Sequence, residues 1–463
     1  MVTAKKRIAV IPGDGIGKEV IPQAVKVMQA AYAAVEFTSF DWGADRYVTD
    51  KVTVPPDGFI TLAWDFDAIL VGAFGDPRVP SNIHAREILL GIRSKMDLYA
   101  NVRPVRLLDA SLCPLKGIEP NDLDFVVIRE NTEGVYGDLG GVFKEGTPDE
   151  VAIQEDINTR KGVERIIRCA FEYCASNKKL DGSPRRRVLM CDKSNAMTHG
   201  GGLWQRVFKE VAVDHPHIET QHMYVDALAM QMVRDPRGFD VIVTNNMFGD
   251  IITDLAAGLQ GGLGMAASGN LHPGKTPMFE PVHGSAPPIA GKNIANPFGA
   301  ILTAAMMLAH LGMKAEAERI EAAVLDAVRG KKTTADIGGT LGTREAGEWV
   351  AERVANGLKH SKFKAYVGDP DFHDGVIERV CQEATEISVE ISGYSGTRYM
   401  VRFSGVESVI SHNPEGMVLY ALSEVEAEFP LREFHFANSS EPDEDGGDSR
   451  LAIIARGFSV EKI

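Results

Sequence analysis

Short apolar runs alternate with longer segments of helical periodicity along most of the chain. Phe66–Gly72, Phe125–Ile128 and Val241–Val243 have the length and composition of buried strands. Lys18–Ala34 and Ala300–His310 carry apolar residues at helical spacing. The pattern therefore predicts buried strands and amphipathic helices in this part of the chain.

The pattern changes near His360. Beyond it, apolar and polar residues alternate at strand period in four segments, separated by glycines: Thr385–Ser392, Thr397–Ser404, Met417–Glu428 and Leu451–Val460. From Ser361 onward nine Lys or Arg stand against nineteen Asp or Glu, so this part carries −10 of the total charge of −15. We expect a domain boundary near His360, followed by a small antiparallel β domain. Its acidic segment Glu441–Asp448 is expected to be a solvated loop.

Length, charge and cysteine usage narrow the function classes. A chain of 463 residues is too long for one compact core, so two or more domains are expected. The sequence shows neither a signal peptide nor an apolar run of membrane-spanning length. Five scattered cysteines without metal-ligand spacing indicate free thiols and a cytoplasmic location. The acidic net charge argues against a nucleic-acid partner.

The segment from Phe239 to Asp254 carries the first candidate chemistry. A short buried strand turns through two asparagines into a helix, on which Asp250 and Asp254 share one face because they are four residues apart. Two such carboxylates suit Mg²⁺ or Mn²⁺, which take hard oxygen ligands. In isolation, such an Asp is more often only a favourable charge in the first turn of a helix, and the motifs elsewhere in the chain reverse this preference.

Charged residues also follow several other predicted elements. Arg93, Arg103 and Arg129 stand at the ends of elements, where three converging guanidinium groups could bind a di- or tricarboxylate. Three unrelated surface ion pairs are the alternative. Lys193 and Asp226 end two short predicted strands. The glycine-rich turn Gly13–Gly17 either admits an anion to backbone N–H groups or is only a tight turn.

Six motifs in order resemble the β-decarboxylating dehydrogenases, the isocitrate/3-isopropylmalate dehydrogenase family. They are Ile-Pro-Gly-Asp-Gly-Ile-Gly (11–17), Tyr-Ala-Asn-Val-Arg-Pro (99–104), Arg-Glu-Asn-Thr-Glu-Gly-Val-Tyr (129–136), Asp-Lys-Ser-Asn (192–195), Asn-Met-Phe-Gly-Asp-Ile-Ile-Thr-Asp-Leu (246–255) and Glu-Pro-Val-His-Gly-Ser-Ala-Pro (280–287). The resemblance covers roughly residues 6–357. It implies an α/β fold of two domains that is not a Rossmann fold, with the β-rich accessory domain beyond it.

The resemblance also implies domain limits and an assembly. Residues 1–104 and 265–360 would form a large cofactor-binding domain, and 105–264 a small domain for metal binding and dimerisation. Residues 361–463 would be the accessory domain of unknown role. The family forms homodimers whose active sites combine residues of both subunits.

The motif positions match site residues of this family. The metal ligands would be Asp250 and Asp254, with Asp226 from the partner subunit. Lys193, also across the dimer, would help to take the proton of the C2 hydroxyl, and Tyr136 would reprotonate the enol. Asp226 is therefore predicted to be both catalytic and metal-binding. Arg93, Arg103 and Arg129 match the carboxylate clamps.

The cofactor is predicted to be NAD. Residues that match or precede the cofactor loop are Asn195, Glu280, His283, Gly284, Ser285, Ala286, Ile289 and Asn296. NAD-using members usually have an Asp where this chain has Pro288, and NADP-using members tend to have Lys-Tyr there. Ile289 and Ala295 are similar to those of the NAD-using members.

The substrate is predicted to be 3-isopropylmalate. Leu89 and Leu90 match an apolar pocket for an isopropyl group, whose burial contributes roughly 1.5–3 kcal/mol. Arg86 stands where isopropylmalate enzymes usually have Glu, which leaves homoisocitrate or isocitrate second. Tartrate or D-malate is third, on the resemblance around Asn158. A non-catalytic regulatory relative would be expected to lack a clamp arginine, the matching Lys or a metal-binding Asp. This chain has all of these residues.

Overall fold

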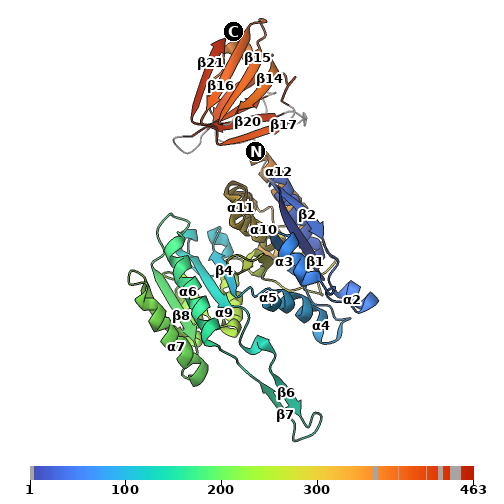
Figure 1. The fold of residues 1–463 in the computed structure, drawn as a ribbon, viewed down its shortest axis with the longest axis vertical. Coiled ribbons are helices and arrows are strands. Elements are labelled where there is room, and N and C mark those ends of the chain that lie inside the picture. The colour runs from blue at the N-terminus through green and yellow to red at the C-terminus, as the bar shows by residue number, and fades with distance from the viewer. Residues whose placement is uncertain (1–4, 358–362, 384, 413, 426–430, 438–449) are drawn as a thin grey trace. The chain divides into compact units, whose positions relative to one another are not determined.

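The computed structural model describes residues 5–357, 363–383, 385–412, 414–425, 431–437 and 450–463, and they form two compact units, Met1–Val354 and Ala355–Ile463 (Figure 1). The predicted boundary near His360 and the acidic segment Glu441–Asp448 lie outside the described residues. The division of the first unit into 1–104 with 265–360, and 105–264, stays a prediction.

One ten-stranded sheet runs through the first unit, in the order β2-β1-β3-β12-β11-β4-β5-β10-β8-β9. Neighbouring strands are parallel except around β11 and β4, where β12–β11, β11–β4 and β4–β5 are antiparallel. The strands are β1 (Lys6–Gly13), β2 (Val35–Ser39), β3 (Ala68–Ala73), β4 (Ala100–Arg106), β5 (Asp124–Glu130), β8 (Arg187–Asp192), β9 (Glu219–Tyr224), β10 (Val241–Thr244), β11 (Ala267–Leu271) and β12 (Met278–Pro281).

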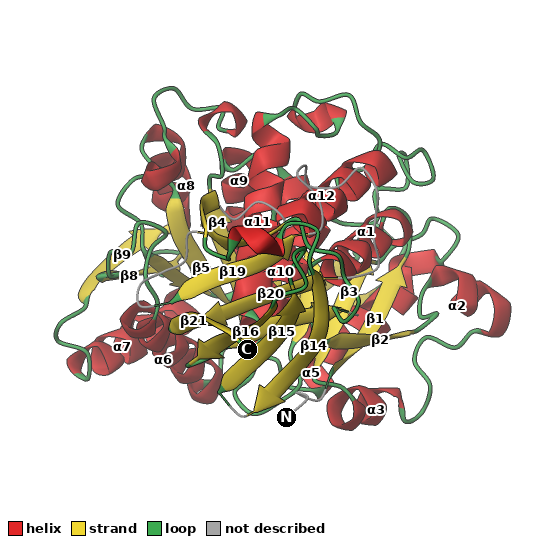
Figure 2. Ribbon diagram, turned by 90° about the horizontal axis from the view of Figure 1, so that it is seen from above, coloured by secondary structure: helices red, strands yellow, loops and turns green. Residues whose placement is uncertain are grey.

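Helices cover both faces of this sheet (Figure 2). Alternate residues of β5 enter different buried clusters: Phe125 and Val127 join one, and Val126 and Ile128 join another. Strand residues buried on both faces explain the continuous apolar runs in the sequence. The helices are α1 (Gly17–Ala30), α2 (Ala44–Asp50), α3 (Gly58–Asp65), α4 (Ile83–Ala85), α5 (Gly91–Lys95), α6 (Arg160–Ser176), α7 (Thr198–Val213), α8 (Val225–Arg234), α9 (Asn246–Leu259), α10 (Phe298–His310), α11 (Lys314–Arg329) and α12 (Thr343–Gly357).

The α/β fold expected from the sequence is confirmed, and two local expectations are corrected. Asp226 does not end a strand, because β9 stops at Tyr224 and Asp226 lies in the first turn of α8. Arg103, expected at the end of an element, lies in the middle of β4. The strands β11 and β12 were not among the elements predicted from the sequence. Their buried polar side chains are hydrogen-bonded, as between Ser268 Oγ and the carbonyl oxygen of Glu280 at 2.8 Å.

The second unit is β-rich, as the alternation predicted. Phe403 and Phe434 lie in its own buried core, whose buried residues run from Phe372 to Ala455 in the part of the chain that the structure describes. Its sheets have the orders β13-β18-β19-β20-β17 and β14-β15-β16-β21. The strands are β13 (Phe363–Tyr366), β14 (Val376–Glu383), β15 (Glu386–Ser392), β16 (Arg398–Ser404), β17 (Ser408–His412), β18 (Ala421–Val425), β19 (Arg432–Ala437), β20 (Arg450–Ala455) and β21 (Gly457–Lys462).

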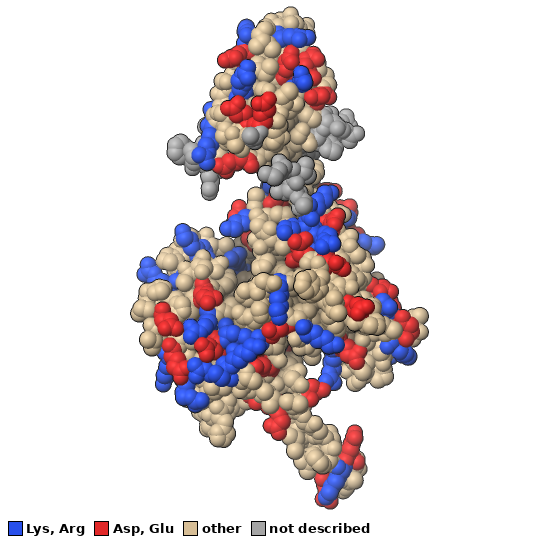
Figure 3. Space-filling model, in the orientation of Figure 1, with Lys and Arg blue, Asp and Glu red and all other residues tan. Residues whose placement is uncertain are grey.

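A two-stranded hairpin extends from the first unit (Figure 1). It consists of β6 (Gly140–Phe143) and β7 (Val151–Gln154), and all residues of both strands are exposed. The stem carries exposed apolar side chains, and charged ones gather at the tip (Figure 3). No helix among the described residues combines the length and the apolar character that crossing a membrane requires.

Candidate active site

Helix α9 carries the two candidate metal ligands at the end of β10. Asn245 begins the helix, since its side chain accepts a hydrogen bond from the backbone N–H of Phe248 at 2.9 Å. The helix then runs without interruption, so Asp250 and Asp254 lie one turn apart. The strand-to-helix turn predicted from the sequence is confirmed.

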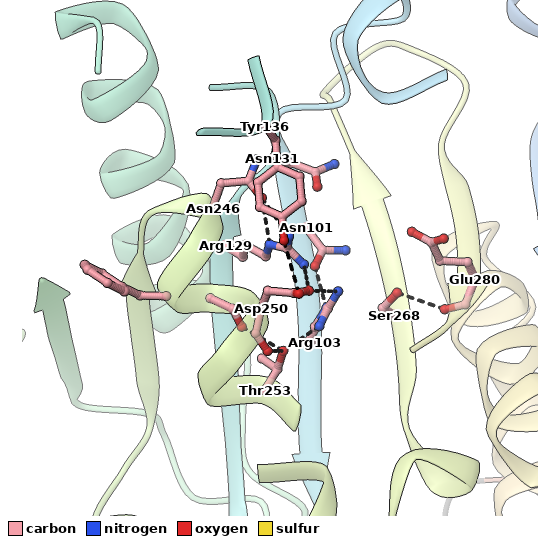
Figure 4. A network of polar contacts seen from close by, with 12 residues as sticks. Asn101, Arg103, Arg129, Asn131, Tyr136, Asn246, Asp250, Thr253, Ser268 and Glu280 are labelled. Carbon is pink, nitrogen blue, oxygen red and sulfur yellow. Dashed lines mark hydrogen bonds and ion pairs between the residues drawn. The ribbon is translucent and has the colours of Figure 1, made fainter. Parts of the chain in front are cut away.

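Asp250 is the centre of a polar cluster (Figure 4). Its Oδ1 accepts hydrogen bonds from Arg129 Nη1 at 2.5 Å and Arg103 Nη2 at 3.4 Å. Tyr136 donates its hydroxyl to Asp250 Oδ2 at 3.2 Å. Arg103 comes from β4 and Arg129 from β5, two neighbouring strands, while Tyr136 lies in the turn after β5. The structure thus brings together four residues that are far apart in the sequence.

Asparagine and threonine side chains hold the two arginines. Arg129 donates twice to Asn246 Oδ1, at 3.0 Å from Nε and 2.7 Å from Nη2. Arg103 donates to Asn101 Oδ1 at 2.7 Å and to Thr253 Oγ1 at 2.5 Å. These acceptors were not among the site residues predicted from the sequence. Asn101 and Asn246 could have been found, since they belong to two of the quoted motifs.

Burial and neighbouring charges shift the pKa values of the cluster. Burial would raise the pKa of Asp250, but the charges of Arg129 and Arg103 outweigh it and hold that pKa below its ordinary value. Burial and then the negative charge of Asp250 raise the pKa of Asp254. Burial, followed by repulsion from Arg129, lowers the pKa of Arg103 to about 9.

The two carboxylates fit a divalent cation in chemistry and charge. The influence of Asp250 on Asp254 shows that two negative groups approach each other, and a cation between them would relieve that repulsion. No group of three or more His, Cys, Asp or Glu side chains with metal-binding geometry occurs in the described part of the chain.

Arg93 joins a second part of the site. Its Nη2 lies 2.5 Å from Glu280 Oε1, and both side chains are buried. Asn270 also donates to Glu280 Oε1, at 2.9 Å, and accepts at its Oδ1 from Asn101 and Asn131. This amide chain connects the Arg93–Glu280 pair with Arg103, whose Nε donates to Asn101. Besides burial, the charge of Arg93 helps to lower the pKa of Arg129, so the three arginines form one cationic site.

Lys193 and Asp226 pair with each other instead of joining Asp250. Lys193 Nζ lies 2.7 Å from Asp226 Oδ1, and the ammonium group also faces the ring of Tyr224 at 5.8 Å. In the described residues, no hydrogen bond or ion pair connects this pair to Asp250 or Asp254. Asn195, two residues after Lys193, is exposed. Within one chain, the structure therefore forms two separate groups of candidate residues.

The predicted cofactor loop follows β12 and packs on the glycine turn. Glu280 lies in β12, and the backbone N–H of Ile16 donates to the carbonyl oxygen of Ser285 at 2.9 Å. Burial lowers the pKa of His283, whose Nε2 has no hydrogen-bond partner among the described atoms. Ile289 packs against the core. The other predicted residues of this loop are Gly284, Ala286, which has a φ of 42°, and Asn296, which donates to Asp336 at 3.0 Å.

The two predicted pocket leucines differ in their surroundings. Leu90 lines a hollow of about 660 Å³, together with Phe59, Gly91 and Tyr136. Leu89 packs against the buried cluster beneath. Arg86 also lines the hollow, where it forms an ion pair with Asp138. The hollow therefore adjoins the Asp250 cluster through Tyr136.

Comparisons with known proteins agree with this geometry. The family described as isocitrate/isopropylmalate dehydrogenase matches residues 7–350. The chain is 45% identical to a 3-isopropylmalate dehydrogenase of Thermobifida fusca over 356 residues, which cover 75% of this chain and 98% of the relative. It is 47% identical to a 3-isopropylmalate dehydrogenase of Corynebacterium efficiens over 351 residues, covering 75% and 99%.

A solved structure shares the fold. The crystal structure of isocitrate dehydrogenase from Methylococcus capsulatus superposes with a TM-score of 0.69 at 36% sequence identity, covering 76% of this chain and 99% of that one. The matched family, the two relatives and the arrangement of the arginines and carboxylates agree, and the chain belongs to the isocitrate/isopropylmalate dehydrogenase family.

Proposed function

We propose that the protein catalyses the NAD-dependent oxidative decarboxylation of 3-isopropylmalate to 4-methyl-2-oxopentanoate. The observation that carries the proposal is the convergence of Arg103, Arg129 and Tyr136 on Asp250, next to a hollow that has both apolar and charged walls. The names of the relatives from Thermobifida fusca and Corynebacterium efficiens support the same substrate. The reaction would remove a hydride from C2, release CO₂ from C3 and return a proton to C3.

The arginines would bind the two carboxylates of the substrate. Arg103 and Arg129 are nearly fully buried, so they attract an anion in surroundings that screen charge weakly. Arg93 adds a third positive charge, which its ion pair with Glu280 offsets. Bidentate contacts from planar guanidinium groups would orient the carboxylates and thus the C2–H bond.

Tyr136 is suited to give a proton to the enol formed on decarboxylation. Burial and then the negative charge of Asp250 raise the pKa of its hydroxyl, so the group stays protonated at neutral pH. Its position beside Asp250 brings the proton to the part of the site where the carboxylates converge. Lys193 would accept the proton of the C2 hydroxyl.

A divalent metal ion, Mg²⁺ or Mn²⁺, would be held by Asp250 and Asp254 with Asp226 of a second subunit. When bound, it would act as a Lewis acid that favours loss of the hydroxyl proton and stabilises the enolate. NAD would bind at the cofactor loop 282–296. Pro288 has no side-chain acceptor for a ribose hydroxyl, whereas Ile289 and Ala295 favour NAD over NADP.

A homodimer with shared active sites would bring the two groups of residues together. The Lys193–Asp226 pair is half-exposed, and α8 and α9 expose Met230, Val233 and Ile251. The stem of the hairpin adds exposed apolar residues, including Val142 and Phe143. Exposed apolar side chains of this kind are typical of interfaces between subunits.

The hollow supports an apolar substituent on C3. Leu90 and Phe59 supply apolar walls, while the ion pair with Asp138 offsets the charge of Arg86. A free arginine at this place would favour the additional carboxylate of homoisocitrate.

All five cysteines lie in the described part of the chain and are free, which supports a cytoplasmic enzyme.

A panel of substrates tests the proposal. 3-Isopropylmalate, homoisocitrate, isocitrate, tartrate and D-malate are each assayed with NAD⁺ and with NADP⁺ in the presence of Mg²⁺ or Mn²⁺. The highest kcat/KM is expected for 3-isopropylmalate with NAD⁺. A higher value for another acid, or for NADP⁺, would replace that part of the proposal, and inactivity towards all five would refute it.

A further inference from the structure

We propose that His84 and Asp14 form a buried clamp that positions the substrate helix relative to the cofactor loop. The substrate helix is here residues 83–95, which comprise α4, a π-helical turn (Arg86–Leu90) and α5. The cofactor loop is residues 282–296. The inference rests on the proposed function, and it assigns a positioning role to two residues that do not touch the reacting atoms.

The two side chains make a short buried contact. His84 Nε2 lies 2.7 Å from Asp14 Oδ2, and the exposed fractions of the two side chains are 0% and 1%. His84 Nδ1 is buried and has no hydrogen-bond partner in the described part of the chain. The contact with Asp14 is therefore the polar interaction that fixes the imidazole ring.

Asp14 connects the substrate helix with three other segments. Its Oδ1 accepts from the backbone N–H of Ala44 at 2.7 Å, where α2 begins. Its Oδ2 accepts from the N–H of Gly75 at 3.0 Å, just after β3. Tyr47 of α2 stacks on the ring of His84 with 6.2 Å between ring centroids. One carboxylate thus joins the glycine turn, α2, the loop after β3 and the substrate helix.

The segments that Asp14 joins also touch the cofactor loop. A Cβ atom added to Gly15 would meet the carbonyl oxygen of Ser285 at 2.0 Å, so the glycine turn and the loop are in direct backbone contact. A Cβ on Gly75 would come within 3.0 Å of Ser285 Oγ. These contacts arise because β1, β3 and β12 are parallel and their carboxyl ends meet at one edge of the sheet. A shift of the cofactor loop would therefore reach Asp14 through Gly15 and Gly75, which contact Ser285.

The entry to the substrate helix is strained. Ser81 and Asn82 adopt φ values of 52° and 50°, in the left-handed region that disfavours residues other than glycine. The π-helical turn that follows is another rare conformation, of a kind found mostly at functional sites. Such backbone persists only where its surroundings hold it, and His84 is anchored two residues after Asn82.

The far end of the substrate helix is tied in a similar way. Arg93 pairs with Glu280 of β12, the strand that leads into the cofactor loop. Leu90, which lines the hollow, lies between the two ties. Binding of the cofactor would thus favour one position of Leu90 and Arg93, and loss of the His84 tie would weaken substrate binding more than turnover.

Three variants test the clamp. His84→Leu removes the polar contact at similar volume, and His84→Gln retains an N–H donor in a similar place. His215→Leu is the control. The ring of His215, which follows the end of α7, packs on the ring of Phe171 and belongs to neither the substrate helix nor the cofactor loop. For each, amide hydrogen exchange of 83–95 and 282–296 is measured without ligands, and kcat and KM for 3-isopropylmalate are measured with NAD⁺. Asp14→Asn is measured likewise if His84→Leu does not fold.

His84→Leu is expected to speed exchange in both segments and to raise KM about tenfold with kcat within about twofold, because a misplaced binding group lowers affinity first. His84→Gln should restore most of the slow exchange and most of the substrate affinity. The control His215→Leu should change neither the exchange rates nor KM. Three outcomes would overturn the clamp. They are unchanged exchange in His84→Leu, an equal effect of the control His215→Leu, and failure of His84→Gln to improve on His84→Leu. Inactivity of the wild-type protein would refute the proposed function instead, and the exchange comparison would still decide the clamp.

Discussion

Asp250 receives hydrogen bonds from three residues of two strands and a turn, and this explains how a half-exposed carboxylate stays charged. The nearby guanidinium groups stabilise the anion more than partial burial destabilises it, so its pKa is lowered. Asp254 has no such partner among the described residues, and its pKa is raised. The pair is therefore asymmetric, and Asp250 supplies the more constant negative charge.

The first prediction follows for Asp250→Asn. The substitution keeps the shape but removes one formal charge from the proposed metal site, so Mg²⁺-dependent kcat/KM should fall about a hundredfold or more. Steady-state assays over a range of Mg²⁺ concentrations measure it, with Asp235→Asn as an exposed control that is expected to be neutral. Full activity of Asp250→Asn, or of the wild-type protein in excess chelator, would contradict the metal site.

Residue identities at this site could be predicted from the sequence, but their pairing could not. Arg103 and Arg129 stand out because they lie within two of the quoted motifs, whereas Arg93 lies in none of them. Their partners depend on which strands are neighbours: β4 lies between β5 and β11, and the residues of β11 are far away in the sequence. The pairing of Lys193 with Asp226, and of Arg93 with Glu280, is likewise a product of the sheet order.

The second prediction concerns pH and the buried His283. Burial lowers the pKa of His283 below the ordinary value of 6.5, so the unfolded chain binds more protons than the folded one just below that pH. The unfolding free energy should therefore fall as the pH drops below 6.5, by up to about 1.4 kcal/mol per pH unit for this group. Urea unfolding at pH 5.5 and 7.5 measures the difference. His283→Gln should reduce this difference in unfolding free energy between the two pH values. His217→Gln, at an exposed position, should leave the difference unchanged.

Among the elements, buried strands and long amphipathic helices were the easiest to predict. β5, β8 and β10 are apolar runs, so burial alone identifies them. β11 and β12 were missed because Ser268, Gly269 and Asn270 lack strand propensity. Pairing with neighbouring strands and the hydrogen bonds of Ser268 and Asn270 stabilise them instead, and these are tertiary contacts.

The third prediction concerns the interface that α8 and α9 of two subunits would form, and the active sites shared across it. If Lys193 of one chain completes the Asp250 cluster of another, a heterodimer of Lys193→Ala and Tyr136→Phe chains has one intact site. Each homodimer should be nearly inactive, and random reassembly of equal amounts should regain about a quarter of wild-type activity. Mixing Lys193→Ala with the double variant is the control that should stay inactive. No recovery in the first mixture would show that both residues act within one chain.

At the scale of the whole molecule, charge and core are divided between the two units. The region from Ser361 onward carries most of the net negative charge, yet the matched family ends at residue 350. The sequence indicated this division through composition and strand-period alternation. It could not indicate a role for the second unit, because its alternation specifies a buried face and no site.

The last prediction is that residues 1–359 fold, dimerise and keep their turnover without the second unit. Among the described residues, the buried core of the first unit uses residues up to Val354, and that of the second unit uses residues from Phe372 onward. We therefore expect the first unit to keep its core when the second is removed. The value of kcat should stay within about twofold, and KM for the anionic substrate should fall slightly at low salt, because a repelling charge is gone. Solubility, sedimentation and kcat/KM of the full and shortened chains, at low and moderate salt, measure this. An insoluble shortened chain, or a kcat/KM reduced more than about tenfold, would show that the first unit depends on the second for its stability or its catalysis.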